Sequence, residues 1–552
     1  MGHSVSENLP FLKRKPVREH SPLVRFPSKG TLTAMSTNDA HTVDTATRRR
    51  MEELGIDVDR SQEILSELNR GAYDGIQPLE AGGIPEMDGS TIIDRRGDSS
   101  LELPDDAYRR RLKELAPEIP AERFGSVAAG IRHLTDADLE TIGVLLYPYL
   151  SYGVLNGGSA SSYADTHKNR SYDEDLFDLY HEAFDRLSKE VQGKPKGITP
   201  AYLNPDGTPG ASFLELKFRM VLRAGDRYRH TAEQWNITPP QGADGSPLQP
   251  GLPFVEMTSL FTDEAIRAAY DEYRDSDYLS EFAQRESALD TAAAVQPLLA
   301  AMTHSDEGRP KRFFLDAWGT PGEPLGLPGG HGQNFQELAP IYRRLQQQGK
   351  HFVYMGNVDN VGFTIEPVSL AILALRGAQA GFDFAFRTPV DVKGGILVYD
   401  QHGALTCGDI GPAISKDEVF AAEDSGKKIL FNCATGLFNL DYLVPNLERV
   451  VAELPMRISN QNKDAGKYSQ AEQVTWEIIG MLDDVVIFGI DKYHRFLAAK
   501  MLLESFLTSG LALEEARKIQ STAPQLAEGL ATVLRDEYDL EMANGRWKPA
   551  ER

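Results

Sequence analysis

The chain has 552 residues, of which 41% are hydrophobic and 25% are charged, so it can bury a large core arranged in several domains. Its 81 acidic residues outnumber its 58 Lys and Arg, and a net charge of −23 argues against binding to duplex nucleic acid or to an anionic membrane. Cys407 and Cys433 are too few for a disulfide framework or a thiolate metal site. Because no apolar run reaches the roughly 18 residues of a membrane span and no signal-peptide pattern occurs, the sequence predicts a soluble, cytoplasmic protein.

Composition and periodicity divide the chain into regions. Residues 1–45 mix Lys, Arg, Pro, Ser and Thr without periodicity, which predicts a disordered arm. Apolar residues at helical spacing predict a helical N-terminal region over 46–146. A core over 147–455 follows, with an insertion at 165–192, and a helical C-terminal region is predicted over 456–552.

Short apolar runs predict buried strands, and they lie at 152–155, 252–257, 312–315, 351–355, 396–399, 428–432 and 485–488. Helical patterns between several of them, for instance at 338–348, favour an α/β fold with a largely parallel sheet. Ligands of such sheets bind beyond the carboxyl ends of the strands. The residues that follow the runs, at 156–158, 258–259, 357–360 and Asn432, are therefore candidates for chemistry.

Two loops are candidates for phosphate binding. Residues 155–158 (Leu-Asn-Gly-Gly) place paired glycines after a strand, where backbone amides can donate to phosphate oxygens. Residues 193–197 (Gly-Lys-Pro-Lys-Gly) form a basic loop in an acidic chain, and an ordinary turn is the alternative for either loop. The segment between them, 171–191, predicts a helix with a capping box at Ser171 and Glu174, and its apolar stripe is Leu176, Leu179, Tyr180, Ala183, Leu187 and Val191.

Further candidates follow in the second half of the chain. His331 lies between glycines, where the backbone is free to touch a flat ligand, although a structural turn is the alternative. Asp359 follows an apolar run, from which one carboxylate can bind magnesium together with substrate phosphates, or else cap the next element. Lys393 and Lys500 lie in glycine-rich or apolar surroundings and together indicate a polyanionic substrate, although each alone fits a surface lysine.

The order of these motifs over residues 150 to 500 resembles that of the UTP–glucose-1-phosphate uridylyltransferase family, also called UDP-glucose pyrophosphorylases. The family's Lys-Leu-Asn-Gly-Gly-Leu-Gly-Thr loop resembles 155–162, its Gly-Pro-Lys segment resembles 194–196, and its Phe-Leu-Asp-Leu segment resembles 213–216. Its later motifs resemble, in the same order, residues 253–262, 330–333, 349–362, 392–395, 431–437 and 495–500.

The resemblance implies a Rossmann-like, glycosyltransferase-A-like nucleotidyltransferase core. The implied reaction joins UTP to a sugar 1-phosphate, with glucose 1-phosphate favoured, and releases pyrophosphate. The residues implied to be catalytic are Lys196, Lys393 and Lys500. Those implied to bind the nucleotide are Leu155, Asn156, Gly157, Gly158, Met257, Gly330, His331 and Asp359, and those implied to face the sugar are Asn357, Gly395 and Asn432. Asp359 would also hold the expected cofactor, Mg²⁺.

The chain departs from the family pattern at several positions. Ala160 and Ser161 replace a Gly-Thr pair, and the insertion makes Lys168 a rival of Lys196 as the catalytic lysine. The glutamate expected after the Lys-Gly-Gly motif has no clear counterpart at 405–410. Two alternatives therefore stay open, a UDP-N-acetylhexosamine pyrophosphorylase and a UDP-sugar-binding regulator without turnover. The predicted partners are UTP and a sugar 1-phosphate, with neither nucleic acid nor a membrane, and the oligomeric state is open.

Overall fold

A computed structural model describes the chain over most of its length. The described residues are 43–73, 79–160, 163–242, 248, 252–284, 289–388, 391 and 393–550, together with the backbone of 12–16. Ser161 of the predicted glycine loop lies outside them, and so does most of the arm predicted over 1–45.

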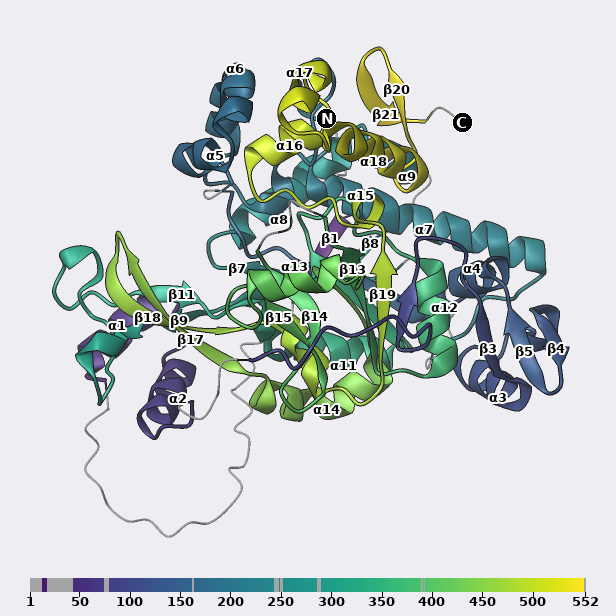
Figure 1. The fold of residues 1–552 in the computed structure, drawn as a ribbon, viewed down its shortest axis with the longest axis horizontal. Coiled ribbons are helices and arrows are strands. Elements are labelled where there is room, and N and C mark those ends of the chain that lie inside the picture. Colours follow the sequence, from purple (N-terminus) through teal and green to yellow (C-terminus); the bar gives the residue numbers. More distant parts are fainter. Residues whose placement is uncertain are drawn as a thin grey trace, which may run out of the picture.

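A central sheet of eleven strands organises the molecule (Figure 1). Its order is β1-β8-β7-β6-β12-β16-β13-β19-β2, and β14 pairs with both β15 and β16. The strands are β1 (Leu12–Pro16), β2 (Ile92–Asp94), β6 (Leu150–Leu155), β7 (Phe254–Ser259), β8 (Leu289–Gln296), β12 (Phe352–Asn357), β13 (Ala380–Phe386), β14 (Gly395–Tyr399), β15 (Leu405–Asp409), β16 (Leu430–Asn439) and β19 (Val485–Ile490). Strands β1, β8, β7, β6 and β12 run parallel, whereas β16 is antiparallel to its neighbours β12 and β13. The predicted α/β fold with a largely parallel sheet is confirmed.

One of the predicted strands is wrong. The run at 312–315 does not form a strand, and only Phe313 makes an isolated bridge, to Met302. Phe313 is buried in the cluster that also holds Met51 and Leu65 from the first two helices. The run is therefore apolar because it packs in a cluster of helix and strand residues, although it does not form a strand itself. The other predicted runs each overlap a strand of the central sheet.

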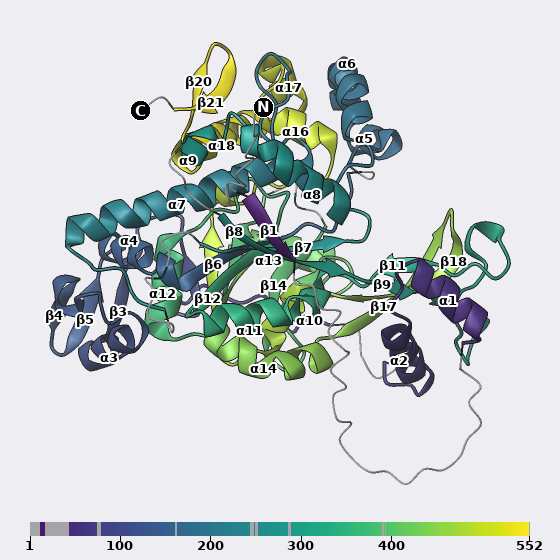
Figure 2. The same cartoon turned by 180° about the vertical axis from the view of Figure 1, so that it is seen from behind.

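Helices cover both faces of the sheet (Figures 1 and 2). One face packs against α10 (Asn334–Glu337), α11 (Ala339–Gln347) and α14 (Leu440–Glu453). The other packs against α4 (Asp136–Leu145), α7 (Phe213–Trp235), α8 (Asp263–Glu272) and α12 (Pro367–Arg376). Helix α7 begins at a capping box formed by Ser212 and Glu215 and crosses the whole face. The remaining helices near the sheet are α9 (Ser280–Gln284) and α13 (Lys416–Asp424).

The N-terminal region is mixed rather than helical. It contains α1 (Thr45–Glu53), α2 (Val58–Asn69) and α3 (Asp105–Leu115), but also a small sheet of β3 (Leu101–Pro104), β4 (Ser126–Ala128) and β5 (Ile131–Leu134). Strand β2 belongs to this region and pairs with β19 at the edge of the central sheet. Strand β1 lies inside the arm predicted to be disordered. Helical spacing is present over 46–70, whereas strands of three or four residues are too short to show a period.

The C-terminal region forms two lobes, one from residues before β19 in the chain and one from residues after it. Strands β17 (Met456–Lys463) and β18 (Gly466–Gln473) pair with β10 (Met302–Thr303) in an arm that leaves the body of the molecule beside β9 (Leu298–Ala300) and β11 (Gly326–Pro328), as Figure 1 shows. Helices α15 (Lys492–Arg495), α16 (Leu502–Thr508), α17 (Leu513–Ile519) and α18 (Ala523–Asp536) form the other lobe with the hairpin β20 (Leu540–Ala543) and β21 (Arg546–Pro549). The region predicted as helical therefore also carries strands, and β19 places part of it in the central sheet.

The insertion at 165–192 packs on this helical lobe. It forms α5 (Thr166–Tyr172) and α6 (Glu174–Val191), and its apolar stripe meets α16 and α17. The predicted capping box at Ser171 is wrong, because Asp173 is the N-cap and its side chain accepts the backbone N–H of Leu176. Across the described residues, none of the helices has the length and apolarity needed to traverse a bilayer.

Candidate active site

The two predicted phosphate loops pair with each other through their backbones. The amide of Ala160 donates to the carbonyl of Lys194 at 2.8 Å, and the amide of Lys196 donates to the carbonyl of Gly158 at 3.0 Å. The insertion therefore leaves and rejoins the site at adjacent positions, although 35 residues lie between Ser159 and its bridge partner Pro195. A ligand that contacts the glycine loop is thereby brought next to Lys196.

Asn156 fixes the relation between these loops. It is fully buried at the end of β6, where its amide nitrogen donates to Glu256 at 2.7 Å and its amide oxygen accepts the backbone N–H of Gly197 at 3.0 Å. A Cβ at Gly197 would lie 2.4 Å from the Asn156 side chain, so only glycine fits there. The side-chain amide of Asn156, which was predicted to bind the nucleotide, is therefore hydrogen-bonded within the protein. Leu155 packs in the core beside it, at 8% exposure.

Gly157 and Gly158 differ in what surrounds them. The carbonyl of Gly157 accepts from the Ser259 hydroxyl at 2.8 Å, and a Cβ would lie 3.2 Å from the amide oxygen of Gln296. A Cβ at Gly158 would meet no described atom within 4 Å. Gly158 therefore borders open space, where a ligand can approach the backbone closely.

The Lys196 side chain is 7% exposed and crosses from the glycine loop to the C-terminal region. Its ammonium nitrogen donates to the carbonyl of Ala499 at 3.0 Å and lies 2.9 Å from the centre of the Tyr163 ring. Burial lowers the pKa of Lys196 to about 7, and the positive charge of Lys500 adds to this, whereas Asp359 acts in the opposite direction. Lys196, Asp359 and Lys500 therefore lie close enough for the charges of the last two to shift the pKa of Lys196.

Asp359 and Lys500 form an ion pair in this neighbourhood. Asp359 lies in the turn after β12, and its carboxylate is 3.1 Å from the Lys500 ammonium, with side-chain exposures of 13% and 61%. Burial alone would raise the pKa of Asp359, but Lys500 and Lys196 together lower it, so the carboxylate is ionised at neutral pH. The Asp359 charge in turn raises the pKa of Lys500.

The rival lysine lies elsewhere. Lys168 is exposed on α5, where its backbone amide is capped by Asp165 at 2.7 Å.

His331 opens a short 3-10 helix, His331–Gln333. Its Nδ1 accepts the backbone N–H of Thr475 at 3.0 Å, which leaves the proton of the neutral ring on Nε2. Burial lowers the pKa of His331 to about 4, so the ring stays neutral at physiological pH. The ring of Trp476 lies beside that of His331, with 5.8 Å between the two ring centres.

Gly330 is required by its surroundings. Its φ is +81°, and a Cβ would lie 2.3 Å from the carbonyl of Gln473. The Gln296 amide nitrogen donates to the Gly330 carbonyl at 2.8 Å, while its oxygen faces Gly157, so this side chain joins the two glycine segments. Met257, in contrast, is 2% exposed and packs in the core below the loop, so its predicted part in the uridine pocket stays a prediction.

Two of the three residues predicted to face the sugar, Gly395 and Asn432, lie on the neighbouring strands β14 and β16. A Cβ at Gly395 would lie 2.5 Å from Cys407 Sγ, and the Asn432 amide nitrogen is 3.5 Å from the same sulfur. The Asn432 oxygen accepts the backbone N–H of Ala434, which holds a left-handed φ of +52°. Asp409 lies opposite Gly395 in the β14–β15 ladder. Strained backbone of this kind is often retained at functional sites.

Asp409 is a carboxylate within 405–410, where the resemblance leads us to expect a glutamate. Arg457 on β17 bonds to it at 3.1 Å and to Glu477 at 2.5 Å, and the charge of Arg457 also contributes to the low pKa of His331. Sequence reasoning missed this group because the carboxylate is shorter than the expected glutamate and Arg457 is distant in the chain. Gln296 was missed for a similar reason, since it ends a strand that no apolar run indicated.

Lys393 and Asn357 are the remaining predicted residues. Lys393 is exposed just before β14, and its neighbour Val392 lies outside the described residues. Asn357 is half-buried at the end of β12, next to Leu155 in the parallel ladder. Their roles at phosphate and sugar stay predictions.

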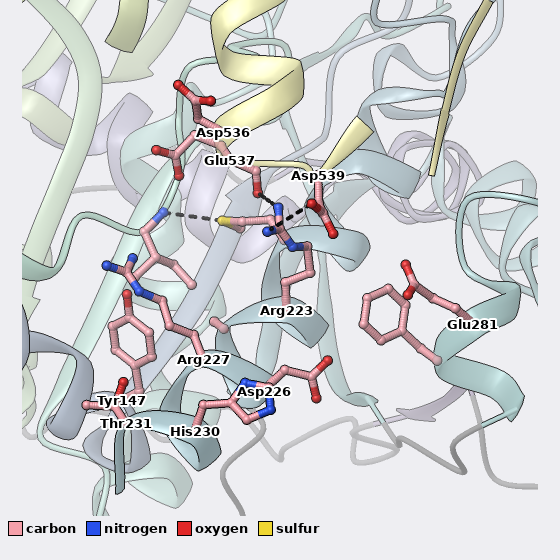
Figure 3. A pocket seen from close by; sticks show the side chains of 14 residues that line it. Tyr147, Arg223, Asp226, Arg227, His230, Thr231, Glu281, Asp536, Glu537 and Asp539 are labelled. Carbon is pink, nitrogen blue, oxygen red and sulfur yellow. Dashed lines mark hydrogen bonds and ion pairs between the residues drawn. The ribbon is translucent and has the colours of Figure 1, made fainter. Parts of the chain in front are cut away.

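A separate cavity of about 290 Å³ lies along α7, away from these loops (Figure 3). Arg223, Arg227 and Tyr147 line it together with acidic side chains that include Glu281 and Asp539. None of the predicted site residues is among its lining residues.

The family model described as UTP–glucose-1-phosphate uridylyltransferase, UDPGP, matches residues 248–523, which is half of the chain. The chain belongs to the UDPGP family. The UDPGP match includes Asp359 and Lys500, whereas the glycine loop and Lys196 precede it.

Individual relatives agree with the UDPGP assignment. A Schizosaccharomyces pombe protein named as a probable UTP–glucose-1-phosphate uridylyltransferase is 26% identical over 258 residues, which are 46% of this chain and 43% of that protein. The match thus spans less than half of the length of this relative. A uridine diphosphate N-acetylglucosamine pyrophosphorylase from Trypanosoma brucei superposes with a TM-score of 0.55 at 13% identity, over 89% of this chain and 92% of that one. A UDP-glucose phosphorylase from the same organism has a TM-score of 0.51 at 15% identity, over 92% and 81%. At these identities the two structures show a shared fold.

Proposed function

We propose that this protein joins UTP to a sugar 1-phosphate, glucose 1-phosphate in the first place, and releases pyrophosphate and a UDP-sugar. The observation that carries the proposal is the convergence of Lys196, Asp359 and Lys500 beside the open backbone at Gly158. These residues come from distant parts of the chain. A protein that only bound a UDP-sugar would have no need of two lysines and a carboxylate where phosphates meet.

The reaction needs charge stabilisation rather than proton transfer. The second pKa of a phosphate monoester is near 6, so the sugar phosphate is already nucleophilic at neutral pH. One of its oxygens forms a bond to the α-phosphorus of UTP, and the bond from that phosphorus to the pyrophosphate oxygen breaks. Both reactants are anionic, so the ammonium groups of Lys196 and Lys500 would offset their repulsion and hold them in line.

A magnesium ion would fit this site only together with the nucleotide. Asp359 offers one ionised carboxylate, and within the described ranges no group of three or more His, Cys, Asp or Glu side chains could hold a metal. Mg²⁺ is commonly held by one or two carboxylates plus phosphate oxygens and water, which matches this donor set. When bound, the ion would offset phosphate charge, and Lys500 would then exchange its partner Asp359 for a phosphate oxygen.

The neutral His331 ring supports the placement of the uracil. Its Nε2–H is a fixed donor, because Thr475 occupies Nδ1 as a donor. A carbonyl oxygen of uracil accepts such a hydrogen bond.

Pyrophosphate release from UTP and a panel of sugar 1-phosphates tests the proposal. We expect turnover that is fastest with glucose 1-phosphate. Faster turnover with N-acetylglucosamine 1-phosphate would instead identify a UDP-N-acetylhexosamine pyrophosphorylase. Binding of UDP-glucose without turnover of any sugar phosphate would identify a regulator.

A further inference from the structure

Helix α7 is hydrogen-bonded to the turn that carries Asp359. Lys217, which is fully buried on α7, donates from its ammonium to the carbonyls of Asn360 and Phe363, each at 2.7 Å. Burial lowers the pKa of this lysine well below its usual value. A buried lysine is costly unless its donors are satisfied, so the position is explained by the carbonyls that it holds.

Tyr538, which follows α18, hydrogen-bonds both to this turn and to Lys217. Its hydroxyl donates to the carbonyl of Val361 at 2.7 Å and accepts from Lys217 at 3.2 Å. The backbone around Tyr538 is itself fixed to α7, because Arg219 donates to the carbonyl of Tyr538 and Arg223 donates to that of Glu537 at 2.8 Å. Figure 3 shows Arg223 pointing toward Glu537 and Asp539.

Asn360 joins the same turn to the segment that leads to Lys500. Its amide oxygen accepts the backbone N–H of Leu497 at 2.9 Å, and its amide nitrogen donates to the carbonyl of Arg495 at 3.1 Å. The same oxygen accepts the N–H of Gly362 at 3.0 Å. Asp359 and Lys500 therefore project from two backbone segments that one buried asparagine holds together.

We propose that Lys217 and Tyr538 are positioning residues for the phosphate site. Neither side chain reaches the ligand; they fix the turn after β12, and with it the separation of Asp359 from Lys500. The inference rests on the proposed function, since the separation matters only if these groups share a metal-bound nucleotide. Displacements of about 1 Å at such groups can lower a rate by roughly a hundredfold.

Tyr538→Phe tests the proposal, because it removes one hydroxyl and keeps the buried ring. Tyr228→Phe is the matched control: Tyr228 lies on α7, the helix of Lys217, is 1% exposed, and its hydroxyl has no hydrogen-bond partner among the described residues. Lys217→Met is the second variant. For each protein we would measure Mn²⁺ affinity in the presence of UTP by electron paramagnetic resonance, hydrogen exchange over 359–364 and 495–500, and turnover.

We expect Tyr538→Phe to weaken Mn²⁺–UTP affinity about three- to tenfold, to speed exchange in both segments, and to lower kcat more than it raises KM for UTP. Lys217→Met should do the same more strongly, and Tyr228→Phe should match the wild type. Unchanged Mn²⁺ affinity and exchange in a folded Tyr538→Phe protein would overturn the proposal, as would equal losses in the control. A wild type that binds Mn²⁺–UTP without turnover would refute the proposed function alone, and one that does not bind it would refute both.

Discussion

Lys196 has an environment suited to binding phosphate: its side chain is buried, burial lowers its pKa to about 7, and its backbone bonds to Gly158 of the first loop. We expect Lys196→Ala to lower turnover by a few orders of magnitude, because one lost phosphate contact in a water-poor site is worth about 3 to 4 kcal/mol. The melting temperature should not fall, because the loss of the hydrogen bond to Ala499 is offset by removal of an amine that is costly to bury. Lys168→Ala is the control, and a normal rate for Lys196→Ala combined with an inactive Lys168→Ala would contradict our assignment.

The low pKa of Lys196 predicts how UTP affinity changes with pH. In the free protein the amine is protonated below a pH of about 7 and increasingly neutral above it. A neighbouring triphosphate favours the ammonium form, so binding above that pH must take up a proton. We expect UTP affinity to weaken by up to about tenfold per pH unit above 7. Calorimetry in buffers of different ionisation enthalpy measures the uptake, which Lys196→Met should abolish; constant affinity up to pH 9 in the wild type would argue against a titrating Lys196.

Asp359 should govern the metal requirement. Asp359→Asn removes the one ligand charge at the site, so we expect turnover to need several-fold more Mg²⁺, with little change in the melting temperature. Titration of the rate with Mg²⁺ measures this effect. Full activity of the wild type in the presence of a chelator would contradict the role of Asp359.

At the scale of elements, α6 packs against α16, the helix that begins just after Lys500. Asn169 accepts the backbone N–H of Leu503 at 3.1 Å, and the Tyr163 hydroxyl meets that of Ser505 at 2.5 Å. Leu187 is 5% exposed in the cluster between these helices. The insertion therefore supports the Lys500 side of the site.

This packing predicts that Leu187→Asp lowers turnover and raises KM for UTP together, because α16 loses its support. His181→Asp, at an exposed position of the same helix, introduces the same charge without entering the cluster and should be neutral. Steady-state kinetics on both variants decides the matter. Equal kinetics for the two, in folded proteins, would make the insertion a passive surface element.

The elements show what could be predicted from sequence and why. Long runs such as β6 and β12 were found because buried parallel strands are continuously apolar, and the glycines and Asp359 follow them directly. The partner of α6 could not be inferred, since an apolar stripe reveals that a helix packs but not against what. Lys217 was missed because a buried lysine inside a helix has no pattern that separates it from a surface one.

At the scale of the whole molecule, the site draws on segments from the first loop at Gly158 to Lys500, so ligand binding is coupled to the integrity of the entire sheet. A ligand at 100 times its Kd stabilises the native state by about 2.7 kcal/mol. We expect Mg²⁺ and UTP to raise Tm by roughly 2 to 5 °C in a thermal-shift assay. ATP is the control, and an equal shift with ATP would show that the uracil is not recognised.

The predicted division of the chain at 146 and 455 stays a prediction, but the sheet takes strands from beyond both positions. Strand β2 pairs with β19, although about 390 residues separate them in the chain. Sequence periodicity reports only on local structure, so pairings at this range cannot be read from it.

The dependence of the site on late residues has a consequence for biosynthesis. Asp359 leaves the ribosome 141 residues before Lys500, which at ordinary rates of translation corresponds to roughly 7 to 30 seconds. Within that interval, from the completion of β13 until β19 is made, β13 lacks its neighbour and its exposed edge can pair with other chains. A nascent or prematurely terminated chain would therefore be both inactive and prone to aggregate, so we expect its yield in cells to depend on chaperones that shield this edge until β19 arrives.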